Sequence, residues 1–246
     1  MSTGSSAPSE DALTRIGSTA QRLAEKPYAK RVCRIEAHYP PPPGEPFYGP
    51  SPEEYVDAIS EAGFEVAIVT GQFDRGTPRF HSRIFAPHPG VDEDLTPRFI
   101  ELCHQRGIIV LSYYPINFSK PLRQVHPEWL MQFIDDGRPF PANQGWFCFN
   151  SDFRDWLPEC LSDFMDHLDI DGFYFDDVNW GSHDKSPYIP SCCCPVCERL
   201  FEEETGFEIP RQVDFGSRAF RHFVNWRYDK LRIFALKESI NFIYIP

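Results

Sequence analysis

The chain has 246 residues and a formal net charge of −12, and both values limit what it can be. A length near 250 residues suits one α/β barrel or two smaller domains. The acidic balance argues against nucleic acid as a partner, because phosphate binding requires a basic surface, and it favours neutral or cationic ligands. We expect no membrane partner, because the sequence has no apolar run of about 18 residues.

The first half of the chain predicts a polar arm followed by alternating strands and helices. Residues 1–28 form the arm and lack an apolar signal core, which favours a cytoplasmic location where thiols stay reduced. One barrel domain is expected over the rest, residues 29–246. Apolar runs and helical spacing predict strands at 30–39, 65–73 and 108–117, with helices at 52–63 and 92–107.

The second half continues the alternation. It predicts a helix over 151–170, whose first turn could start at Pro158, and a strand over 171–180. Two more helices are expected at 194–206 and 215–239. Four repeats of strand and helix indicate an α/β fold with a parallel sheet, of the (β/α)8 TIM-barrel type. An open, flavodoxin-like sheet is the alternative.

Polar and aromatic residues gather where the four predicted strands end. Barrel enzymes place their chemistry at this rim, and acids, amides and rings there suit a sugar. Carboxylates bind sugar hydroxyls, and aromatic rings stack on apolar sugar faces. The candidates for catalysis and substrate binding at these ends are Glu36, His38, Tyr113, Tyr114, Asp176, Asp177 and Asn179.

The fourth predicted strand, DGFYFDDVNW, contains two adjacent aspartates. Successive side chains of a strand point to opposite faces, so one of the two aims into the rim, and we favour Asp176. The structural alternative is that Asp176 makes a salt bridge while Asp177 caps a turn. Glycoside cleavage usually requires two carboxyl groups, and the second is Glu36, Asp177 or a residue on a later strand.

Cysteines are concentrated in the stretch SCCCPVCERLFEEETG, residues 191–206. Cys194 and Cys197 have the spacing of a zinc half-site. Cys192 faces the same way as Cys194 on an extended segment and provides a third thiol, whereas Cys193 faces away. A closed structural zinc site takes its fourth ligand from elsewhere in the fold. Buried thiols without a metal are the alternative, and a disulfide is disfavoured in a reducing compartment.

Several motifs between residues 31 and 210 resemble a glycoside-hydrolase-like barrel family, the hypothetical glycosyl hydrolase 6 family. They are HPGVDEDLTPRFIELCHQRGIIVLSYY, HPEWL, DIDGFYFDD and CCCPVCERLFEEETGFEIP. α-L-Fucosidases and family 42 β-galactosidases are more loosely similar. These families are much longer, which implies that only the N-terminal half to two-thirds of the barrel is present. His88 resembles part of the family's loop after the second strand, where it either contacts substrate or packs near the helix start.

The resemblance also implies roles for individual residues. In the fucosidases a strand ending in Trp-Phe-Asp supplies the nucleophile, and Asp176 falls on that aspartate. Family 42 enzymes have an Asn-Glu pair at the same strand end, so their acid/base role does not transfer directly to Asp176 and Asp177. Some of them hold zinc with a Cys-x-Cys-x-x-Cys pattern and an upstream cysteine. The matching positions imply one structural zinc, with no organic cofactor, on Cys148, Cys192, Cys194 and Cys197.

Two functions agree with these observations. The first is a glycoside hydrolase that binds carbohydrate and, when the full barrel is present, cleaves O-glycosyl bonds with Asp176 at the centre. The second is a non-catalytic or truncated, zinc-stabilised domain that binds carbohydrate or a partner. The oligomeric state stays open, with a homo-oligomer as one alternative.

Overall fold

A computed structural model describes the middle and later parts of the chain. The described residues are 31–35, 50–70, 72–73, 77–78, 80, 82–85, 95–116, 119–139, 146–176 and 192–237. Contacts group the chain into two compact units. The first comprises Met1–Tyr114, Pro158–Asp176 and Asn241–Pro246, and the second comprises Pro115–Leu157 and Asp177–Ile240. The predicted N-terminal arm lies outside the described residues. No helix in the described part is long and apolar enough to cross a bilayer.

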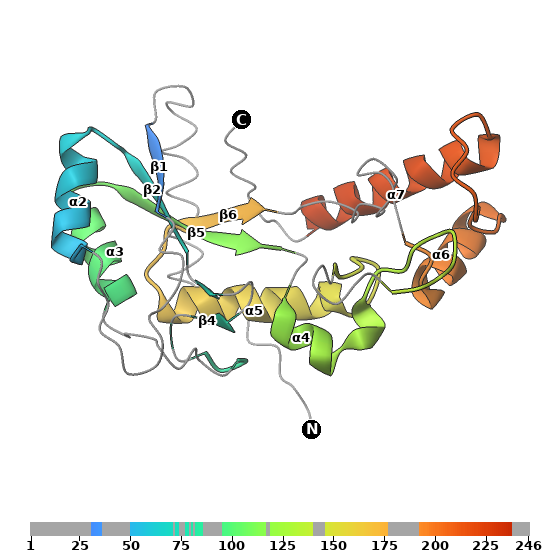
Figure 1. Ribbon diagram of the computed structural model, residues 1–246, viewed down its shortest axis with the longest axis horizontal. Coiled ribbons are helices and arrows are strands. Elements are labelled where there is room, and N and C mark those ends of the chain that lie inside the picture. Colours follow the sequence, from blue (N-terminus) through green and yellow to red (C-terminus); the bar gives the residue numbers. More distant parts are fainter. Residues whose placement is uncertain are drawn as a thin grey trace. The chain divides into compact units, whose positions relative to one another are not determined.

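The first unit contains a four-stranded sheet whose strand order follows the chain. The strands are β1 (Val32–Ile35), β2 (Val66–Thr70), β5 (Ile109–Pro115) and β6 (Gly172–Asp176), in the order β1-β2-β5-β6. β1 and β2 are parallel, as are β2 and β5, with Val66 beside Val32 and Ile109. This confirms the α/β fold with a parallel sheet. A flavodoxin-like sheet would place its first strand between two others, whereas β1 is at the edge of the strands that the structure describes (Figure 1).

Two helices connect the first three strands of this sheet. α2 (Pro52–Glu61) starts with a capping box, in which Ser51 Oγ accepts the N–H of Glu54 and the Glu54 carboxylate accepts the N–H of Ser51. Gly63, with φ 73°, follows the helix in the left-handed region that favours glycine. α3 (Leu95–Gln105) packs against α2 (Figure 1). Both helices lie within the ranges that the sequence predicts.

The two faces of the sheet have different surroundings. On one face, Val66, Ile68, Ile109 and Leu111 form a buried cluster with Tyr113 and Tyr174 packed against it. On the other face, Tyr114 and Phe173 contact Phe164 of α5 (Phe153–His167) with nearly perpendicular or tilted rings. Side chains of neighbouring positions in β5 and β6 therefore lie in different environments, as the alternation of a strand requires.

Some elements differ from the sequence prediction. α5 begins at Phe153 and runs through Pro158, so the expectation that its first turn starts at the proline is wrong. Pro158 has no N–H, and the helix continues without that one donor. β3 (Gln72–Phe73) and β4 (Thr77–Pro78) form a short antiparallel pair, and the predicted strand over 65–73 divides into β2 and β3.

The second unit consists of short segments before α5 and two helices after β6. α4 (Lys120–Val125) and the 3-10 helix η1 (Pro127–Trp129) follow each other closely. α6 (Pro195–Thr205) ends at Gly206, as predicted, with φ 72°, and α7 (Arg218–Lys237) follows it. Phe201 of α6 makes edge-to-face contacts with Phe223 and Trp226 of α7, which bury the apolar sides of both helices.

Asp163 of α5 is a buried acid that holds residues 82–85 against the helix. Its carboxylate is 1% exposed and accepts hydrogen bonds from Ser82 Oγ and from the backbone N and Nε of Arg83. We expect Asp163→Ala to destabilise the protein by about 2–4 kcal/mol, because three donors lose their acceptor. The urea midpoint measures this. Asp166→Ala, which removes a more exposed partner of Arg83, should cost less than about 1 kcal/mol, and equal midpoints would contradict the assignment.

Candidate functional site

Asp176 and Tyr113 meet at the carboxyl ends of β6 and β5. The Tyr113 hydroxyl donates a hydrogen bond of 2.9 Å to Asp176 Oδ2. The ring of Tyr113 stacks beside that of Tyr174, with centroids 6.2 Å apart and planes 27° from parallel. Tyr174 and Asp176 are two positions apart on β6, so all three side chains belong to one face of the sheet. A carboxylate and two aromatic rings are thus brought together where barrel enzymes carry their chemistry.

Tyr114, the other predicted substrate-binding tyrosine, lies on the opposite face. Its ring packs against Phe164, and its hydroxyl is 3.0 Å from Cys160 Sγ. Burial raises the pKa of Tyr114 well above its ordinary value. The structure therefore brings Tyr113 to Asp176 and does not bring Tyr114 to it.

The remaining site candidates fall outside the described residues. These are Glu36, His38, Asp177 and Asn179 at strand ends, and His88 in the loop after the second strand. Glu36 and Asp177, the candidates in this chain for a carboxyl group that acts together with Asp176, have no described position, so the identity of that group stays a prediction.

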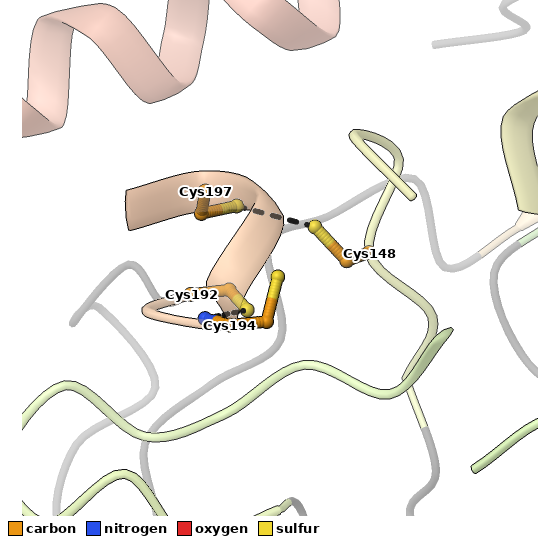
Figure 2. A group of neighbouring side chains, drawn as sticks. All are labelled: Cys148, Cys192, Cys194 and Cys197. Carbon is orange, nitrogen blue, oxygen red and sulfur yellow. Dashed lines mark hydrogen bonds between the residues drawn. The ribbon is translucent and has the colours of Figure 1, made fainter. Parts of the chain in front are cut away.

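Four buried cysteines of the second unit form a compact group. Their sulfur atoms all lie within 4.8 Å of one another, and Cys148 Sγ is 3.3 Å from Cys197 Sγ. Figure 2 shows Cys148 on one segment facing Cys192, Cys194 and Cys197 on another. Thiolates bound tetrahedrally at about 2.3 Å from a metal lie about 3.8 Å apart, so the group has the right size for one ion. The four sulfurs can hold a metal ion.

Local structure positions the sulfurs on both segments, the one with Cys148 and the one with the other three cysteines. Cys148 follows Phe147, which forms an antiparallel bridge with Leu130, and its backbone N–H donates to Trp129 O at 2.8 Å. On the other segment, Cys194 is the N-cap of α6 and Cys197 lies in the first turn. The positive end of the helix dipole therefore faces the thiols.

Several N–H groups point at the sulfurs. Cys192 Sγ accepts hydrogen bonds from the backbone N of Gln132 at 3.1 Å and of Cys194 at 3.2 Å. Cys197 Sγ accepts from Asn150 Nδ2 and from Arg227 Nη1, both at 3.4 Å. Donors of this kind are typical of the surroundings of metal-bound thiolates, whose orientation and electron density they adjust.

The thiols of the group do not behave like separate buried thiols. Hydrogen bonds from Cys192, Cys194 and Cys197 lower the pKa of Cys148 well below its ordinary value. Burial raises the pKa of Cys192 well above its ordinary value, and the neighbouring thiols, including the charge of Cys148, raise it further. Cys193 is different, since its Sγ donates to Phe133 O at 3.0 Å and turns away from the group. This agrees with its predicted outward orientation.

Sequence reasoning missed Arg227 and Asn150 at this centre. Arg227 is 2% exposed and lies on α7, thirty residues after Cys197. From the sequence alone, an arginine in an amphipathic helix is expected at the surface, because arginine is rarely fully buried. The Asn in FCFNSDF is two residues after Cys148, and that closeness is the only signal that could have pointed to it.

Cysteines outside the four-cysteine group should be alkylated at rates that depend on how deeply each thiol is buried. Burial raises the pKa of Cys160 to about 12 and that of Cys103 to about 12. At pH 8 only about 10⁻⁴ of such thiols are ionised, and the thiolate is the nucleophile. We expect iodoacetamide at pH 8 to alkylate the half-buried Cys33 first, with rates at Cys160 and Cys103 rising about tenfold per pH unit. Peptide mass mapping checks this, and equal labelling of Cys33 and Cys160 in native protein would contradict it.

The described residues contain a parallel α/β sheet, an aspartate at the strand ends and a buried four-cysteine group. The sequence model of the family described as hypothetical glycosyl hydrolase 6 matches residues 51–177, more than half of the chain. The chain therefore belongs to that family. A search of curated proteins found no match.

One solved structure supports the fold, and two others are less similar. The chain superposes on α-L-fucosidase isoenzyme 2 from Paenibacillus thiaminolyticus with a TM-score of 0.55 and 19% identity, over 85% of this chain and 31% of that chain. A hypothetical protein from Ruminiclostridium thermocellum gives 0.46 at 16% identity, over 74% and 84% of the two chains. The α-galactosidase from Lactobacillus brevis gives 0.44 at 16%, over 65% and 24%. The present chain thus spans less than a third of the fucosidase.

Proposed function

We propose that this protein is a glycoside hydrolase that binds carbohydrate at the carboxyl ends of its sheet strands. The observation that carries the proposal is the hydrogen bond of 2.9 Å between Tyr113 and Asp176, at the ends of neighbouring strands in a member of a glycosyl hydrolase family. The rings of Tyr113 and Tyr174 beside it offer an apolar surface for a sugar face. Membership in the family and the fucosidase fold agree with this role.

In the proposed reaction Asp176 is the carboxylate that acts at the anomeric carbon. Tyr113 donates to one of its oxygens and holds the carboxylate in one orientation, which favours attack or charge stabilisation by the other. Cleavage requires a second carboxyl group that protonates the departing oxygen. Glu36 and Asp177 stay our candidates for that role, and a residue outside this chain is the alternative.

We also propose that the four cysteines hold a structural zinc ion. Soft thiolate ligands in a tetrahedral set favour zinc, and four protein ligands leave no open position for substrate. Bound zinc would tie the segment at Cys148 to the start of α6 within the second unit. The proposal includes a cytoplasmic location, because such a centre needs cysteines that are kept reduced.

The test is hydrolysis of a panel of 4-nitrophenyl glycosides by the full-length protein. We expect turnover of at least one glycoside, and a decrease of about tenfold in kcat/KM for Tyr113→Phe, because one hydrogen bond to the carboxylate is lost. Tyr228→Phe, an exposed tyrosine of α7, serves as the control and should match the wild type. Sugar binding without turnover would favour the alternative, a non-catalytic carbohydrate-binding domain. Absence of both turnover and binding would refute the proposal.

A further inference from the structure

The four-cysteine centre carries a charge that its surroundings must offset. Four thiolates around a divalent ion leave a net charge of about −2. The sulfurs lie in an apolar cluster that includes Phe133, Phe201, Phe220 and Phe223, where water is excluded. A charge buried among apolar side chains is strongly unfavourable unless an opposite charge or hydrogen bonds compensate for it.

Arg227 is the cation that the fold places against these sulfurs. The residue is 2% exposed, and Nη1 donates to Cys197 Sγ at 3.4 Å. Although burial alone lowers the pKa of an arginine, the nearby thiols raise that of Arg227 above its ordinary value. The backbone N–H groups and Asn150 give neutral hydrogen bonds to the sulfurs, whereas Arg227 adds a full positive charge.

The register of α7 on α6 keeps Arg227 in this place. The neighbouring Trp226 donates from Nε1 to Glu204 at 2.8 Å, and Lys230 pairs with the same carboxylate. Phe223, one turn before Arg227, packs against Phe201 of α6. These contacts fix the helix on both sides of Arg227, so its position does not depend on the sulfur contact alone.

We propose that Arg227 is the counter-ion of the metal centre and couples metal binding to the packing of α7 on α6. The inference rests on the proposed metal centre. A role as counter-ion explains why an arginine is buried beside the apolar cluster. Without a charge to balance, burial of an uncharged side chain at this position would cost less free energy than burial of an arginine. The metal-bound thiolates would hold α7 through Arg227, and Arg227 would make the centre retain its metal more tightly.

Zinc affinity of the intact chain tests the inference. We would measure it by competition with a chromophoric chelator for the wild type, Arg227→Met, Arg227→Lys and the control Arg199→Met. Arg199 lies on the same helix as Cys197 but is exposed and pairs with Glu203, so its loss removes one charge from the same unit without touching a sulfur. We expect Arg227→Met to bind zinc about 10–100-fold more weakly, while Arg227→Lys keeps most of the affinity and Arg199→Met keeps all of it.

The outcomes separate the inference from the metal proposal. A wild type that takes up no zinc refutes the metal centre and the inference together. Wild-type affinity in folded Arg227→Met refutes the inference alone, as does an equal loss in Arg199→Met. If Arg227→Met does not fold, NMR of the wild type decides. The Arg227 guanidinium resonances should exchange slowly and move on zinc removal, and resonances that do not respond to zinc would overturn the inference.

Discussion

Cys197→Ser is expected to abolish metal binding at the proposed centre and to destabilise the second unit. Cys197 lies in the first turn of α6 and is within 4.8 Å of the other three sulfurs, so its loss breaks the tetrahedral set. Structural zinc contributes apparent binding free energies of about 10–16 kcal/mol, which makes a decrease of about 10 °C or more in Tm reasonable. Elemental analysis should give one zinc per wild-type chain and nearly none in the variant, and circular dichroism should give the melting curves.

Cys193→Ser is the matched control for this variant. Cys193 is adjacent to two of the four cysteines and 2% exposed, but its Sγ donates to Phe133 O. A serine hydroxyl can make the same hydrogen bond, so zinc content and Tm should stay close to those of the wild type. Equal zinc loss in both variants would mean that the four-sulfur assignment is wrong. Full zinc content in Cys197→Ser would contradict it as well.

Asp176→Asn is expected to reduce glycoside hydrolysis by about 10³-fold or more, because an amide can neither attack the anomeric carbon nor stabilise positive charge there. Asparagine has the same shape and can still accept the hydrogen bond from Tyr113, so the fold should be kept. The measurement is kcat/KM on the best substrate of the glycoside panel, together with Tm of both proteins.

The control for this prediction is Asp57→Asn. Asp57 lies on α2, is 57% exposed and pairs with Arg106 at the surface, so the same chemical change there should leave hydrolysis unaffected. Turnover by Asp176→Asn equal to that of the wild type would remove Asp176 from the reaction. A loss of turnover accompanied by a large decrease in Tm would point to a structural role instead.

The sequence predicts the main elements of the sheet and its helices because their signals are local. The apolar run at Ile109–Pro115 and the Ser51 capping box define β5 and α2 without tertiary information. The sequence does not predict α4, because six residues are too few for a clear helical periodicity, although Ser119 and the proline after Lys120 mark its start. Contacts of α5 with Tyr114 and Phe173 offset the helix-breaking tendency of Pro158. The single barrel domain over residues 29–246 stays a prediction.

The sequence predicts a site residue only where its spacing from a neighbouring residue determines the direction of its side chain. Alternation along a strand separates Cys192 and Cys194 from Cys193, and the structure has that arrangement. Alternation also separates Tyr113 from Tyr114, but which of the two faces Asp176 depends on the register between β5 and β6. The position of Cys148 came from a resemblance to other families, since nothing in its own neighbourhood marks it as a ligand.

Binding of sugars to the chain itself tests the proposed carbohydrate site at the strand ends most directly. Saturation-transfer NMR with fucose, galactose and glucose would report contact of each sugar with the wild type and with Asp176→Ala. We expect at least one sugar to give a signal with the wild type, and Asp176→Ala, with its zinc retained, to lose that signal. No signal from any sugar with folded, zinc-loaded wild type, or an unchanged signal in Asp176→Ala, would contradict a carbohydrate site at the strand ends.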